Sequence, residues 1–150
     1  MIRKLILSIS FSILLFGGTL KIEDKIGTFS LTNQFDKIEI IKADISTIIV
    51  SFDDKSLDIV TKFLTKKPDD FLKNTNSIFI ANISCKPSVV TRMFTLPKLR
   101  DLKYDIMIIN DEKNIKFSKQ HEKITIYKIS EGTIKSISYV DSIEALEELF

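Results

Sequence analysis

The chain has 150 residues, of which 44% are hydrophobic and 28% charged, so it fits one globular domain and excludes wholesale disorder. Its 22 basic and 20 acidic residues give a formal net charge of +2, and Arg3 and Lys4 lie at the very start. Without those two, the charges balance at 20 against 20, so the net charge gives no evidence for nucleic-acid binding, which favours a basic domain, and we expect no nucleic-acid partner.

The first twenty residues have the layout of a secretory signal peptide. Two cations precede an apolar run over residues 5–16, and Gly17 and Gly18 follow it. The run is short for a membrane span, which needs about 20 apolar residues. We therefore expect residues 1–20 to be a signal peptide, or an uncleaved membrane anchor, and residues 21–150 to form one domain. The expected location is the periplasm.

The first half of this domain predicts a hairpin, a buried strand and a helix. After a short linker at residues 22–27, apolar and polar side chains alternate over residues 28–32 and 37–41, around a polar turn. Residues 47–52 are apolar enough for a central parallel strand. Residues 57–64 have helical spacing, and we expect Asp53, Asp54 or Ser56 to cap that helix.

The second half predicts further strands and helices. Residues 77–83 form a second buried strand, which reaches the sheet through a parallel crossover. Residues 88–94 predict a helix with Val89, Val90, Met93 and Phe94 in the core, and Pro97 predicts that a kink or a second turn starts there. The remaining expected elements are a strand over 104–109, a brief pairing at 115–117, a hairpin of 124–129 with 133–139, and a last helix capped by Asp141.

This order predicts an α/β fold with a central mixed sheet. Parallel βαβ units are followed by an antiparallel hairpin, helices cover both faces, and the N-terminal hairpin precedes the core. The outline is that of the thioredoxin fold.

Several stretches of the chain resemble exported bacterial thioredoxin-like proteins of unassigned function. They are residues 26–35, Ile80-Ala81-Asn82-Ile83-Ser84, Pro87-Ser88-Val89-Val90 and residues 94–99. The resemblance implies a thioredoxin-like fold and places the reactive dithiol of redox members at the bend after residue 52. Here that bend reads Asp53-Asp54-Lys55-Ser56, without cysteine. The groove-lining proline that redox members carry before the third core strand is also missing, since Lys103 and Tyr104 stand there.

Cys85 is the only cysteine in the chain and the first candidate for a reactive residue. It follows the second buried strand, so it should lie at the same sheet edge as Asp53, Asp54 and Ser56. Lys86 and Arg92 would favour its thiolate. A single-thiol oxidoreductase or peroxidase acting through Cys85 is therefore the alternative function, although one cysteine cannot form an internal disulfide.

The other chemical possibilities are weaker. Asp53 and Asp54 could act as paired carboxylates, but helix capping already explains them. The sole histidine, His121, stands in a polar turn, and no spacing of His, Cys, Asp or Glu predicts a metal site. No Gly-rich strand-to-helix turn predicts a dinucleotide cofactor, so we expect no cofactor.

We therefore predict a non-redox thioredoxin-like protein of the cell envelope that binds a protein or peptide partner. The binding groove would lie at the carboxyl end of the strands, around Asp53, Asp54, Ser56, Cys85, Lys86 and Arg92. Contact with a membrane is expected only if residues 1–20 stay attached.

Overall fold

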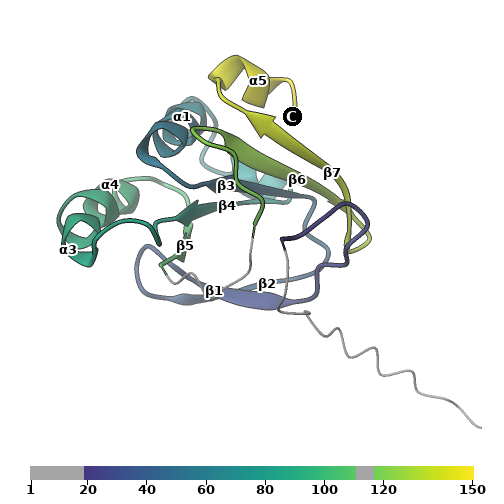
Figure 1. The fold of residues 1–150 in the computed structure, drawn as a ribbon, viewed down its shortest axis with the longest axis horizontal. Helices are drawn as coiled ribbons and strands as arrows, with labels where there is room; N and C mark the ends of the chain where they lie inside the picture. Colours follow the sequence, from purple (N-terminus) through teal and green to yellow (C-terminus); the bar gives the residue numbers. More distant parts are fainter. Residues whose placement is uncertain (1–18, 111–116) are drawn as a thin grey trace, which may run out of the picture.

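The computed structural model describes residues 19–110 and 117–150, which form a twisted sheet flanked by helices (Figure 1). The strand order is β2-β1-β5-β4-β3-β6-β7. The strands are β1 (Phe29–Asn33), β2 (Ile38–Ile41), β3 (Thr47–Ser51), β4 (Ser77–Asn82), β5 (Met107–Ile109), β6 (Ile124–Ser130) and β7 (Thr133–Val140). The helical segments are α1 (Asp54–Thr65), α2 (Phe71–Asn74), α3 (Ser88–Val90), the π-helical turn η1 (Thr91–Thr95), α4 (Leu96–Arg100) and α5 (Ile143–Glu147).

The parallel strands β3, β4 and β5 form the centre of the sheet. All five residues of β3 are buried, as the continuous apolar run predicts for a strand covered on both faces. Strand β6 pairs with β3 in antiparallel orientation, and β7 pairs with β6. The hairpin of β1 and β2 joins the sheet through β5. The predicted order of strands is therefore confirmed, while the brief pairing expected at 115–117 falls largely outside the described residues.

The two faces of the sheet are covered differently. Ile49 packs in a core with side chains from α1, including Val60 and Phe63, and the buried side chains of α2, α4 and α5 belong to the same core. Ile48, on the opposite face, belongs to a second core that contains no side chain from a described helix. The N-terminal segment and the β1–β2 hairpin close this second face, so the helices expected on both faces lie, in the described part, on one.

The segment predicted as a linker, residues 22–27, packs against the domain. Ile26 is 5% exposed, and its N–H donates to the carbonyl of Gly132 at 2.7 Å. The N–H of Ile134 donates to the carbonyl of Asp24 at 2.9 Å. The linker prediction is therefore wrong, because this segment bonds to the start of β7, more than 100 positions away in the sequence.

The helix at residues 88–100 is continuous through Pro97, and of the two predicted alternatives the second holds: a new α-helical turn, α4, begins at Leu96. Leu96, directly before the proline, has helical φ and ψ of −60° and −42°, and its N–H donates to the carbonyl of Thr91. That five-residue step makes a π-helical turn, which is wider than an α-helical one. The wider turn accommodates Pro97, which has no N–H to continue the ladder.

Lys103 and Tyr104 do not line a groove beside the bend after β3. The Tyr104 hydroxyl donates toward the carbonyls of Leu64 and Pro68, at 3.1 and 2.5 Å, near the carboxyl end of α1. The segment beside the bend is the one before β6, where Glu122 contacts Asp53. The groove position predicted at Lys103 and Tyr104 is therefore wrong, because those residues lie at the other end of α1.

The last helix begins one residue later than predicted. Ser142 caps α5, because its hydroxyl accepts a hydrogen bond from the N–H of Ala145 at 3.1 Å. Asp141 precedes the cap. Leu146 is fully buried against the helix-side core, as the apolar spacing predicts.

Asp53 caps α1 and also holds the segment before β6. One of its carboxylate oxygens accepts from the N–H of Ser56 at 2.8 Å, and the other accepts from the N–H of Glu122 at 3.0 Å. The Ser56 hydroxyl reaches back to the N–H of Asp53 at 3.3 Å and completes a capping box. Partial burial raises the pKa of Asp53, but the hydrogen bonds from Ser56 and Glu122 outweigh it, so the net pKa lies below 3.8.

We expect Asp53→Ala to lower the free energy of unfolding by about 1–2 kcal/mol at pH 7, because two backbone N–H groups lose their acceptor. Since folding lowers the pKa of Asp53, its stabilisation is present above the unfolded value of 3.8 and is lost as the pH falls through the lower folded value. The difference in the free energy of unfolding between the unmodified protein and Asp53→Ala should therefore become smaller below about pH 4. Urea unfolding followed by circular dichroism from pH 3 to 7 measures it.

The matched control is Asp53→Ser, which keeps an acceptor for Ser56 and loses the one for Glu122. Its free energy of unfolding should lie between that of the unmodified protein and that of Asp53→Ala. Equal urea midpoints for the three proteins at pH 7 would show that the cap is not stabilising.

Candidate functional site

The carboxyl ends of β3 and β4 bring five of the six predicted residues together: Asp53, Asp54, Ser56, Cys85 and Lys86. The Cys85 sulfur lies 3.7 Å from the carbonyl oxygen of Phe52, the last residue before the bend. Lys86 forms an ion pair with Asp54 and also donates to the Thr95 hydroxyl at 3.0 Å. The ion pair therefore links the start of α1 to the 88–100 helix.

Cys85 is exposed at this edge, and its surroundings differ from those that the sequence suggested. Its S–H is within reach of the Phe52 carbonyl. The Lys86 ammonium, expected to favour a thiolate, is bound by Asp54 and Thr95 instead. The thiol is therefore accessible to solvent, but the ammonium group of Lys86 is bound to Asp54 and Thr95.

Asp53 and Asp54 do not form a carboxylate pair that shares a proton. Asp53 accepts from the backbone at Ser56 and Glu122, whereas Asp54 pairs with Lys86. Each carboxylate therefore has its own structural partner. His121, which is 90% exposed at its side chain, lies near Glu122 in the solvated turn that the sequence predicts.

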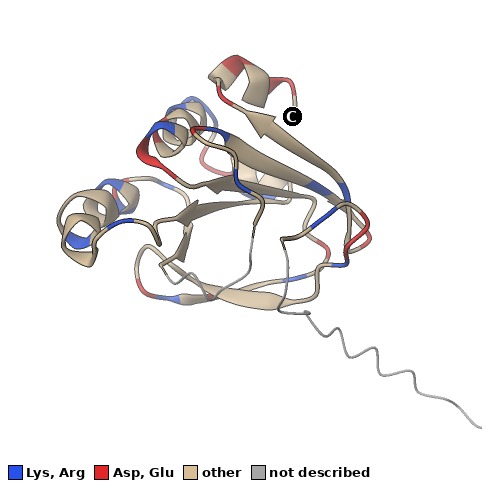
Figure 2. Cartoon of the chain, viewed as in Figure 1, with Lys and Arg blue, Asp and Glu red and all other residues tan. Residues whose placement is uncertain are grey.

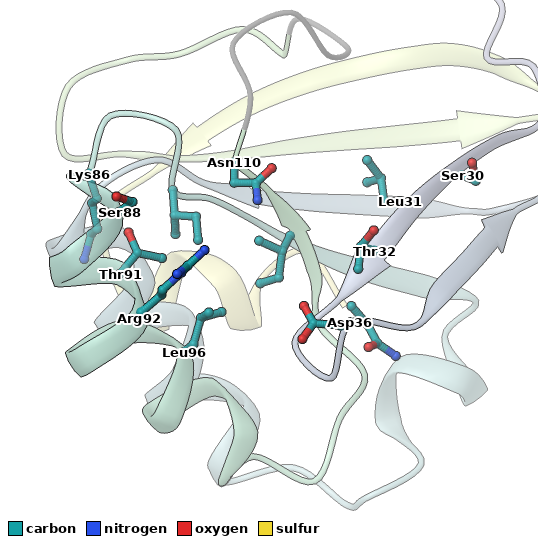
Figure 3. A pocket seen from close by; sticks show the side chains of 13 residues that line it. Ser30, Leu31, Thr32, Asp36, Lys86, Ser88, Thr91, Arg92, Leu96 and Asn110 are labelled. Atoms are coloured by element: carbon teal, nitrogen blue, oxygen red, sulfur yellow. The ribbon is translucent and has the colours of Figure 1, made fainter.

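Arg92 lies on another side of the 88–100 helix, away from Asp53 and Ser56. It lines a pocket of about 510 Å³ between that helix, the β1–β2 turn and the end of β5. Figure 3 shows its side chain extending from the helix into this pocket, with Thr32 and Asp36 on the far side. Lys86 lines the same pocket, at its edge.

The most unusual feature of the site was missed by sequence reasoning. The 88–100 helix turns its threonines inward and its large apolar side chains outward. Thr91 and Thr95 are buried, whereas Val89, Met93 and Phe94 are 65%, 64% and 61% exposed. Val90 is 41% exposed. The prediction that these four apolar side chains belong to the core is therefore wrong.

One signal in the sequence points to this arrangement. Leu99 is buried, and stepping back four residues at a time from it leads to Thr95 and Thr91. Phe94 stands five positions before Leu99, or about 140° around the helix. A single helix face cannot bury both, and Leu99 continues into the core through Leu102.

Two of the outward apolar side chains, Val90 and Phe94, border a groove. A depression of about 660 Å³ runs between α1 and the 88–100 helix, with Leu57, Val90, Phe94, Leu99 and Leu102 as its apolar lining. Asp54, Asp58 and Lys62 line it from α1, and Lys98 from the other helix. Asp58 pairs with Lys62 at 2.8 Å, so these α1 charges, like Asp54, already have partners.

The 88–100 helix carries only positive charge. Arg92, Lys98 and Arg100 stand on it, and no Asp or Glu lies between residues 88 and 100. Figure 2 shows these blue positions on a helix at the side of the molecule, apart from the mixed charges of α1. Within the described residues, Lys98 forms no ion pair.

The described part of the chain holds neither a metal-binding cluster nor a helix that could span a membrane. Across residues 19–110 and 117–150, no three His, Cys, Asp or Glu side chains cluster closely enough to hold a metal ion. In the same residues, every helix is too short or too polar to span a bilayer.

Comparison with known proteins shows the fold. No protein-family model and no curated protein matches the chain. A protein from Chlorobium tepidum, assigned as the thiol:disulfide interchange protein DsbE, is similar in structure with a TM-score of 0.55 and 14% identity, over 87% of this chain and 95% of that one. A protein from Neisseria meningitidis, assigned as a thioredoxin, has a TM-score of 0.53 and 14% identity, over 86% of this chain and 89% of that one.

A third structure, the thioredoxin domain of a thiol-disulfide oxidoreductase from Bacteroides vulgatus, has a TM-score of 0.50 and 7% identity, over 87% of this chain and 99% of that one. Sequence identities this low show that the fold is shared, and nothing about function. The chain has the thioredoxin-like α/β fold with a mixed seven-stranded sheet, which confirms the fold class that its sequence predicts.

Proposed function

We propose that this protein is a non-redox binding module of the cell envelope, exported through its N-terminal segment, which docks a protein or peptide partner. The observation that carries the proposal is the outward apolar face of the 88–100 helix. We call Val89, Val90, Met93 and Phe94, together with the groove beside α1, the docking surface.

The exposure of these side chains supports a docking role. Single exposed apolar residues are ordinary on a protein surface, but a contiguous group marks an interaction site. Here four of them occupy adjacent positions on two turns of one helix, while threonines fill the buried positions. A helix that served only to cover the core would bury its apolar side chains.

The charge around the docking surface indicates the chemistry of the partner. The charges of α1 at the groove are paired internally, whereas the 88–100 helix offers Lys98 without an acidic partner among the described residues. A partner segment with apolar side chains and flanking carboxylates would therefore fit the surface. The same positive charge disfavours a second copy of this chain docking face to face.

The chemistry at the strand ends supports a role without sulfur exchange. Dithiol exchange needs a thiolate and a second sulfur to resolve the mixed disulfide. The bend holds Asp53 where redox relatives of the fold are expected to carry cysteine, and Cys85 is the only sulfur nucleophile in the chain. The bend instead caps α1, whose first residue, Asp54, lines the groove.

The docking surface predicts a sharp loss of binding in one variant. Met93→Ser combined with Phe94→Ser should lower partner recovery from a cell-envelope extract at least tenfold, because truncating central apolar anchors costs above about 1–2 kcal/mol each. Its urea midpoint should hardly change, since both side chains are exposed. Quantitative mass spectrometry of proteins retained on the immobilised domain measures recovery.

Ile38→Ser is the matched control, because Ile38 is an exposed apolar residue, 76% accessible, on β2. It should retain the partners of the unmodified domain. Unchanged recovery with the double variant, or an equal loss with Ile38→Ser, contradicts docking through the 88–100 helix.

Cys85→Ser separates this proposal from the single-thiol alternative. We expect the variant to recover the same partners in the same amounts, because the docking surface contains no sulfur chemistry. The comparison is made in the same extract under non-reducing conditions. Partners recovered only through a bond to the Cys85 sulfur, and released by reductant, would favour the oxidoreductase or peroxidase.

A further inference from the structure

We propose that the pocket between the 88–100 helix and the β1–β2 turn binds an organic carboxylate with an apolar body, and that Arg92 receives the carboxylate. This inference goes beyond the partner-binding function. Arg92 stands two positions before Phe94, or about 200° around an α-helix, so the pocket and the groove that Phe94 lines lie on different sides of the helix.

The pocket has the size of a small-molecule site, and its lining combines polar side chains with an apolar floor. Its volume of about 510 Å³ lies within the usual range for ligand pockets, roughly 300–1,000 Å³. Ile83, Leu96 and Ile108 supply apolar surface inside it. Ile83 and Ile108 are 4% and 9% exposed, so the sheet holds this floor rigidly. Such a floor accommodates a hydrocarbon body.

Arg92 supplies the charge that orients a ligand on this floor. Figure 3 shows its side chain reaching into the pocket, beside Ser88 and Thr91 and across from Thr32. Among the described residues, Arg92 forms no ion pair and no side-chain hydrogen bond. A guanidinium presents two parallel N–H groups that match the two oxygens of a carboxylate.

The other polar groups favour a single negative charge. Lys86 lines the pocket but is held by Asp54, so it offers little to a ligand. Asp36 stands across the pocket and faces Arg100 at 3.8 Å, and its carboxylate would repel a doubly charged phosphate. Ser88 and Asn110 offer neutral hydrogen-bonding groups at the rim. One guanidinium, with neutral donors at Ser88 and Asn110 and a carboxylate across the pocket, suits a singly charged carboxylate better than a doubly charged anion.

Two sources share this chemistry, a free organic acid and the carboxyl end of a peptide. The probes distinguish them: 4-methylpentanoate and N-acetyl-leucine represent free acids, and a pentapeptide ending in leucine represents a chain terminus. N-acetyl-leucinamide and the pentapeptide amide are the neutral controls. Inorganic phosphate tests the doubly charged anion.

Binding is measured by ¹H–¹⁵N NMR titration of the whole domain. We expect the acids to shift amide signals around Ser88, Thr32 and Asn110, and the neutral amides to leave them unchanged. Arg92→Gln should weaken binding of the acids about 10- to 100-fold, which is the worth of a charge-assisted hydrogen bond. Lys103→Gln, which removes a cation outside the pocket, should bind them as the unmodified domain does.

The outcomes separate clearly. Tighter binding of the pentapeptide than of N-acetyl-leucine assigns the site to the carboxyl end of a peptide. Equal binding of the two assigns it to a free organic acid. Both results support the proposal that the pocket binds a carboxylate. The proposal is overturned if no acid binds at about 10 mM, if the amides bind equally, if Arg92→Gln changes nothing, or if phosphate binds more tightly than the acids. Failure here leaves partner docking through Phe94 standing, because that surface is tested by other variants.

Discussion

The two hydrogen bonds that Asp53 accepts set the geometry of the carboxyl end of the sheet. One fixes the start of α1 through Ser56, and the other fixes the segment before β6 through Glu122. Two elements more than 60 positions apart thus meet at one carboxylate. Because both oxygens have backbone partners, the bend is a structural corner. It occupies the place where the resemblance to thioredoxin-like proteins would put reactive sulfur.

That corner positions the 88–100 helix as well. The adjacent residue, Asp54, binds Lys86, and Lys86 reaches Thr95 in the middle of the helix. With Leu99 buried behind it, the helix is held at its middle and near its end, and its apolar side chains face outward. One side of the helix then borders the apolar groove with α1, and the other borders the pocket of Arg92. The candidate binding features of this protein therefore lie beside this helix and not at the bend.

The sequence predicts the sheet well and the helix at residues 88–100 poorly, for a physical reason. Strands such as β3 and β4 consist of continuous apolar runs whose only stable place is the centre of a sheet, so their pairing and the position of Cys85 near Asp53 follow. For the helix, periodicity locates an apolar face but does not say whether core or solvent covers it. The inward threonines Thr91 and Thr95 become informative only once Leu99 is known to be buried. Likewise, the packing of Ile26 depends on a hydrogen bond to Gly132, a contact too remote for local patterns to reveal.

We propose that this scaffold carries the thioredoxin-like fold without disulfide chemistry. The most direct measurement is reduction of insulin disulfides by the purified domain in the presence of dithiothreitol, followed by turbidity, with a dithiol thioredoxin as the positive control. The account predicts that insulin precipitates no faster than with dithiothreitol alone, because Asp53 and Asp54 cannot exchange electrons with a disulfide and Cys85 has no resolving partner. Precipitation accelerated by the domain, and abolished by Cys85→Ser, would contradict it.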